Sequence, residues 1–259
     1  ADGDWRAWNP RNWMANPTGN IDGADFGTDF FNPAGVFQNP WYSRLVQDPN
    51  FWQKWIDRFQ TLRATEFSTN ALFGIVDSLT NKLGAVSTRE IARWSESTPR
   101  SGTVLPPVGW PDRSYSHNFS GTYGGEIAFL KRWLADRVNF IDTNFLALPT
   151  LSQTNGPVSV GQTVTLSPAA KANSRLLYTL NGTDPRLPGG AISPAALSNH
   201  GPVTITITNN VRLFARSWNP THQNVTGLNS PPISSPWSGP SIASFYTTIP
   251  PLRVTEIMF

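Results

Sequence analysis

The stretch FIDTNFLALPTLSQTNGPVSVGQTVTLS, residues 140–167, contains the point at which the hydrophobic period of the chain changes. Before it, large apolar residues recur every three or four positions, which predicts a helix over residues 123–146. After it, apolar and polar residues alternate, as is typical of strands. Pro149 lies between the two patterns, and proline ends a helix. The sequence therefore predicts two domains that meet near residue 149.

The first predicted domain, residues 1–149, is rich in tryptophan and helical. Residues 2–39 hold Trp, Pro, Asn and Gly without a regular period, which indicates a long loop. Apolar residues at helical spacing then predict one helix over residues 51–62 and a second over residues 69–83. Such stripes of large apolar groups are first of all core packing.

The ends of these helices carry recognisable signals. Ser68 or Thr69 is the predicted cap of the second helix, and Gly84 is its predicted end. Ser87 and Glu90 have the spacing of a capping box, which predicts a short third helix up to Trp94.

Residues 150–250 are predicted to form an antiparallel β-sandwich. Short β-branched runs alternate here with Asn-Gly, Gly-Pro, Asn-Pro and Gly-Gly turns. The predicted strands are residues 158–160, 163–166, 176–180, 203–207, 211–218 and 242–247. Residues 251–259 alternate like the start of a further β domain, so we expect the chain to be cut from a longer one. The predicted fold class is therefore multidomain α + β.

Composition excludes several kinds of function. The net charge is only +3 and the basic residues form no run, which argues against nucleic acid as a partner. The absence of cysteine excludes disulfides, thiolate chemistry and cysteine-ligated zinc. There is no apolar run long enough to span a membrane.

Two short motifs each have two interpretations. Asp25-Phe26-Gly27 spells the tripeptide that holds magnesium in protein kinases, but it also suits an ordinary turn. Asp22, Asp25 and Asp29 are either ligands of a structural cation or turn formers. The histidines His117, His200 and His222 lie far apart in the sequence, and we expect them in exposed loops. Asn118, Asn181 and Asn224 each begin an N-glycosylation sequon.

Residues 178–186, YTLNGTDPR, form a strand that runs into an Asn-Gly turn and an Asp-Pro step. They resemble the Tyr-Thr-x-Asp-Gly-Thr-x-Pro motif of the chitobiase/β-hexosaminidase C-terminal domain family, an immunoglobulin-like accessory sandwich. Asn181 stands where that family has Asp. The resemblance covers about residues 150–248 and implies an accessory, non-catalytic module.

Residues 40–45 (PWYSRL), 48–51 (DPNF) and 130–137 (LKRWLADR) resemble the C-terminal lobe of CotH-type kinase domains. The resemblance implies a helical kinase-like lobe, and ATP with Mg in an intact domain. The family binds metal through Trp-Asp-x-Asp, of which Asp2 is either the second carboxylate or part of an ordinary turn. The family's catalytic Asp lies further upstream, so no catalytic or nucleotide-binding residue is expected within this chain.

The last eight residues, 252–259, are similar to the first strand of a lamin-tail-like domain. Together the resemblances imply a fragment of a large exported bacterial protein, located outside the cell or on its surface. The complete protein would be a CotH-like protein kinase acting on a protein substrate, and this fragment alone would be inactive.

Two alternatives remain open at this stage. The first is a non-catalytic adhesion or carbohydrate-binding module whose partner is a surface glycan, which exposed Trp and Tyr side chains would favour. The second is that the Trp-rich helices are simply a structural domain.

Overall fold

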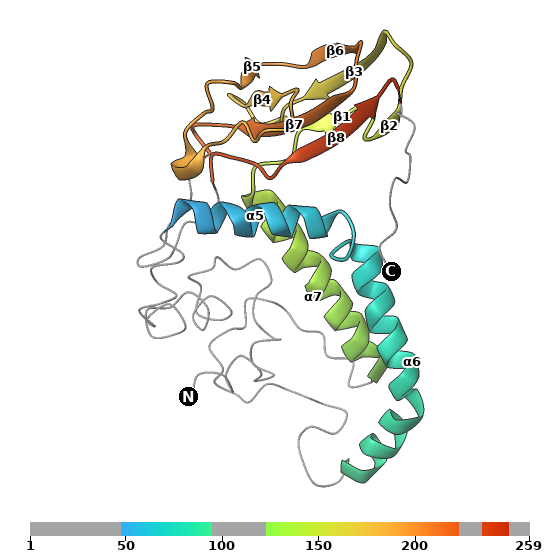
Figure 1. Ribbon diagram of the computed structural model, residues 1–259. Coiled ribbons are helices and arrows are strands. Elements are labelled where there is room, and N and C mark those ends of the chain that lie inside the picture. Colours follow the sequence, from blue (N-terminus) through green and yellow to red (C-terminus); the bar gives the residue numbers. More distant parts are fainter. Residues whose placement is uncertain (1–47, 95–122, 223–234, 249–259) are drawn as a thin grey trace, which may run out of the picture. The chain divides into compact units, whose positions relative to one another are not determined.

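The computed structural model describes residues 48–94, 123–222 and 235–248 (Figure 1). These residues divide into two compact units, with the division between Phe145 and Leu146. Within the described residues, the first unit has three α-helices, and the second has eight strands and one short 3-10 helix. Among the described helices, none combines the length and the apolar character needed to cross a membrane.

Helix α5 (Pro49–Arg63) begins at a well-formed cap and confirms the helix predicted from the apolar spacing. The Asp48 side chain accepts a hydrogen bond from the Asn50 backbone N–H at 2.8 Å, and Pro49 occupies the first helical turn, where its missing N–H costs nothing. The buried face of α5 includes Trp52 and Ile56.

Helix α6 (Thr69–Trp94) confirms one end signal and corrects two others. The Ser68 hydroxyl accepts a hydrogen bond from the Ala71 N–H at 3.2 Å, which makes Ser68 the cap. The helix does not end at Gly84, because one internal glycine costs only about 1 kcal/mol. Ser87 is not a cap either: its hydroxyl donates to the Gly84 carbonyl at 2.8 Å inside the same helix.

Helix α7 (Tyr123–Asn144) lies alongside α6 in Figure 1 and confirms the helix predicted over residues 123–146. Phe145, which follows it, packs with Trp52 and Ile56 of α5 in a small apolar core. The Phe59 and Phe145 rings meet edge to face, with centroids 5.5 Å apart.

The prediction of a helical kinase-like lobe is wrong. Most of the described elements are strands, arranged in two sheets, and the three helices enclose no lobe of their own. The apolar residues from which α6 was predicted show why. Val76 is buried, whereas Leu79 and Leu83 are about half exposed. An apolar period predicts that a helix forms, but it does not show that another element covers the whole apolar face.

The second unit contains two sheets. One has the order β1 (Thr150–Leu151), β3 (Gln162–Ser167), β6 (Val203–Ile207). The other has the order β2 (Gly156–Pro157), β8 (Ser241–Tyr246), β7 (Val211–Trp218), β4 (Arg175–Thr179), β5 (Leu197–Asn199). The 3-10 helix η2 (Pro188–Gly190) precedes β5. Inward-facing side chains of both sheets share one buried core, which includes Val164, Leu166, Leu176, Ile207, Leu213 and Phe245.

The pairing of the strands corrects the prediction of a purely antiparallel sandwich. Strand β2 runs parallel to β8, with Gly156 opposite Phe245, whereas the other pairs are antiparallel. Residues 158–160, predicted as a strand, instead lead into a turn in which the Gln162 N–H donates to the Ser159 carbonyl at 3.0 Å. Gly161 in this turn has φ 89°, a conformation that favours glycine.

Candidate functional site

Most of the motif residues singled out in the sequence lie outside the described residues. These are Asp2, Asp22, Asp25, Asp29, His117, Asn118 and Asn224. The structure therefore does not test Asp2 as a metal ligand. His200 is exposed, as expected, but His222 is buried and its Nδ1 lies 2.5 Å from the Lys171 Nζ.

Two ion pairs connect the described helices of the first unit. Lys131 of α7 contacts Asp77 of α6, with 2.5 Å between Nζ and Oδ1. Arg63 at the end of α5 contacts Asp142 of α7, with 2.7 Å between Nε and Oδ2, and also donates to the Phe67 carbonyl at 2.9 Å. All four charged side chains are partly exposed, so each pair contributes about 1 kcal/mol or less.

The Arg137 side chain of α7 has a shifted pKa. Burial lowers its pKa to about 10, because a guanidinium cation loses hydration when it is buried. The side chain is still charged at neutral pH. Two other residues of this part of α7, Trp133 and Val138, are buried, which indicates that the LKRWLADR segment packs against its surroundings.

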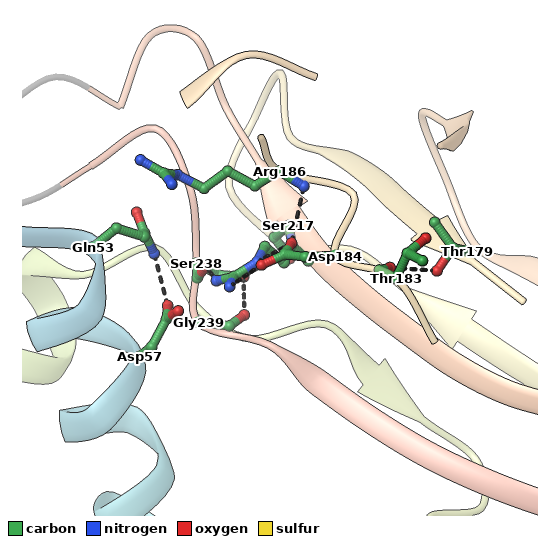
Figure 2. Close-up of polar contacts among 10 residues, drawn as sticks. Gln53, Asp57, Thr179, Thr183, Asp184, Arg186, Ser217, Ser238 and Gly239 are labelled. Atoms are coloured by element: carbon green, nitrogen blue, oxygen red, sulfur yellow. Dashed lines mark hydrogen bonds and ion pairs between the residues drawn. The ribbon is translucent and has the colours of Figure 1, made fainter. Parts of the chain in front are cut away.

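One carboxylate of the second unit pairs with a buried arginine. Asp184 is the only acidic residue between residues 146 and 248. Its two oxygens accept hydrogen bonds from Arg216 Nε at 2.8 Å and Nη2 at 2.7 Å. Arg216 is only 3% exposed, and its Nη1 donates to the Ser238 carbonyl at 2.8 Å. The pair joins the loop after β4 to strand β7 and to the segment before β8, and Figure 2 shows Asp184, Ser217 and Ser238 close together there.

The YTLNGTDPR stretch forms the turn that presents Asp184. The Asn181 Oδ1 accepts hydrogen bonds from the Thr183 N–H at 3.1 Å and from the Thr183 hydroxyl at 2.7 Å. The Thr179 hydroxyl donates to the Thr183 carbonyl at 2.5 Å (Figure 2). Gly182 has φ 78°, and a Cβ there would lie 2.7 Å from the Arg212 Cδ. These contacts make the stretch a structural turn.

Sequence reasoning missed Arg216 as the partner of Asp184. The two signals that were available are an arginine inside the apolar run of residues 211–218 and the absence of any other acid in this part of the chain. A buried arginine needs an acceptor, and only one carboxylate was at hand.

Among the described residues, no group of three or more His, Cys, Asp or Glu side chains is arranged to hold a metal ion. Each ion pair described above joins charged groups of a single unit, and no chemical step is assigned to them.

The comparisons with known proteins give a family match for the first part of the chain. A family model described as CotH kinase protein matches residues 2–141, which is more than half of the chain. No curated protein and no solved structure gave a match.

Proposed function

The chain belongs to the CotH kinase protein family, and from this membership we propose that the complete protein is an ATP-dependent protein kinase. It would transfer the γ-phosphoryl group of ATP to a hydroxyl of a protein substrate. The observation that carries the proposal is the length of the family match, which includes all of α5 and α6 and most of α7.

The described helices have a supporting role in this proposal. Their ion pairs, Lys131 with Asp77 and Arg63 with Asp142, fix α7 against its two neighbours. Phosphoryl transfer depends mainly on positioned charges around the phosphates and the metal. We propose Asp2 as a metal carboxylate, with ATP and Mg bound by it and by residues of a longer chain.

We place the second unit in the proposal as an accessory module of an exported, multidomain protein, outside the cell or on its surface. Its turn at Asn181 and its two-sheet packing support the resemblance to the chitobiase C-terminal, immunoglobulin-like family. The lamin-tail-like start at residues 252–259 belongs to the same proposal and lies outside the described residues.

Incubation with ATP, Mg and a casein-like acceptor tests the proposed activity. We expect this chain alone to give no label above a heat-inactivated control. The longer protein should label the acceptor, and Asp2→Asn should reduce that labelling far more than Asp4→Asn, its neighbour in the same segment. Absence of label with the longer protein would refute the kinase proposal.

Carbohydrate binding is a second candidate because of one exposed aromatic side chain. Trp55 of α5 is 46% exposed and stacks on Trp52, with ring centroids 6.1 Å apart and an interplanar angle of 9°. Such a flat apolar face suits a sugar ring. A glycan array probed with the unchanged chain, with Trp55→Ala and with Phe67→Ala as the control tests it. Hits that only Trp55→Ala removes would support this candidate, and an array without hits would end it.

A further inference from the structure

The second unit carries more cations than carboxylates. Between residues 146 and 248, five lysine and arginine side chains stand against one carboxylate, that of Asp184, which gives a formal charge of +4. The basic residues are Lys171, Arg175, Arg186, Arg212 and Arg216. Asp184 already binds Arg216. One carboxylate cannot neutralise the other four cations, so this part of the chain attracts anions from outside it.

One of these cations, Arg175 at the start of β4, lies over an aromatic ring. Its guanidinium carbon is 5.7 Å from the centroid of the Trp218 ring, which is within the range of a cation–π contact. Arg175 and Trp218 are directly opposite each other in the pairing of β4 with β7, so their side chains lie on the same face of the sheet. Both are half-buried, and among the described residues no ion pair engages Arg175.

A second tryptophan holds Trp218 in place. Trp237 is only 1% exposed, its ring centroid is 6.3 Å from that of Trp218, and the two backbones form a β-bridge. The Trp237 Nε1 donates to the Gly190 carbonyl at 2.9 Å. Arg186 also ends here, because a Cβ on Gly190 would lie 3.8 Å from both Arg186 Nη2 and Trp237 Nε1. Two arginines therefore flank a pair of tryptophans that the fold fixes.

We propose that this arginine–tryptophan cluster, Arg175, Trp218, Trp237 and Arg186, binds an acidic polysaccharide. A carboxylate or sulfate group of the polymer lies on the Arg175 guanidinium, whose planar donors match two oxygens of such a group. The ring of Trp218 already orders this guanidinium, so less freedom is lost on binding. The site is independent of kinase activity and of Trp55, and only the choice of a surface polymer rests on the proposed location outside the cell.

The arrangement of the rings argues against single-stranded nucleic acid as the ligand. Proteins that bind single strands offer free aromatic faces on which the bases stack. In this cluster Arg175 already lies over Trp218, and Trp237 is buried. The cluster therefore offers positioned charge rather than a platform for bases, which suits a polymer that is recognised by its oxyanions.

Binding to four anionic polymers at physiological ionic strength tests the proposal with the unchanged chain. The probes are polygalacturonate, heparin, polyglutamate and single-stranded polydeoxythymidine. We expect one of the two polysaccharides to bind several-fold more tightly than polyglutamate and polydeoxythymidine, and the one that binds shows whether the oxyanion is a carboxylate or a sulfate. Absence of binding, equal binding of all four, or preference for the polypeptide or the nucleic acid would overturn the proposal.

Substitutions then test the assigned residue with the polysaccharide that binds. Arg175→Gln should weaken binding several-fold, and Arg175→Lys should weaken it nearly as much, because lysine keeps the charge but lacks the planar donors. Arg212→Gln is the matched control, since it removes the same charge from an exposed position of β7, and it should weaken binding much less. Hydrogen exchange in β4 and β7 confirms that each variant keeps its fold. Equal effects of Arg175→Gln and Arg212→Gln, or native binding by Arg175→Lys, would overturn the assignment.

Discussion

Replacing Asp184 by asparagine should destabilise the second unit more than replacing its partner does. Asp184→Asn keeps the size of the side chain but leaves the Arg216 cation buried without a counter-charge. Breaking a buried pair in this way costs about 3–5 kcal/mol. Asp184 is 34% exposed, so water screens part of the interaction, and we expect a loss of about 2–3 kcal/mol in the free energy of unfolding.

Removing the arginine instead leaves a less costly defect. Arg216→Met fills the site with an apolar side chain of similar length, and the remaining Asp184 carboxylate can be hydrated through its exposed third. The expected loss is about 1–2 kcal/mol, mainly because the Ser238 carbonyl loses its donor. The asymmetry between the two variants is the feature that distinguishes a buried cation from a surface ion pair.

Hydrogen exchange measured by mass spectrometry is the suitable assay, because the chain has two units and one global transition is not assured. Peptides from β7 and β4 report the opening free energy of the second unit alone. Arg212→Gln, at an exposed position of β7, is the matched control and should change it by less than about 0.5 kcal/mol. If Arg216→Met costs as much as Asp184→Asn, the reasoning fails.

Three further results are expected. Gly182→Ala should cost about 1–2 kcal/mol in urea unfolding, and more than Gly161→Ala, because both positions have positive φ but only the first places a Cβ against Arg212; equal losses would contradict this. Ser68→Ala should cost about 1 kcal/mol and speed amide exchange in the first turn of α6, whereas unchanged exchange would exclude the cap. The stability difference between the native chain and Arg137→Gln should be constant from pH 6 to 9. It should then shift in favour of the native chain as the pH rises above about 10, since the unfolded chain binds more protons there; a shift near neutrality would refute the assigned pKa.

Local patterns in the sequence predicted those elements whose formation is decided locally. Strands β6 and β7 and helix α5 have enough residues to show a period, and the Ser68 cap shows a preference of single residues. Strands β1, β2 and β5 have only two or three residues, so no alternation could reveal them. They exist because a neighbouring strand offers hydrogen bonds, which is a property of the assembled sheet.

The contacts of the candidate site were less accessible to prediction than the elements. Asp184 and Arg216 are 32 residues apart, and only the pairing of β4 with β7 brings their segments together. The exposure of Leu79 and Leu83 could not be predicted either, because the same spacing of apolar residues occurs on buried and on exposed helix faces.

The parallel pairing of β2 with β8 has a mechanical consequence. These are the second and the last of the described strands of the second unit, and Gly156 and Pro157 lie opposite Phe245 and Tyr246. A force that pulls residues 149 and 248 apart is directed along both strands in opposite senses. The hydrogen bonds between them, with the bond from the Val158 N–H to the Tyr246 carbonyl, are then loaded together in shear rather than one after another. A module placed between other domains by these two ends would resist stretching at this short pairing, once the two-residue pairing of β1 with β3 next to residue 149 has given way.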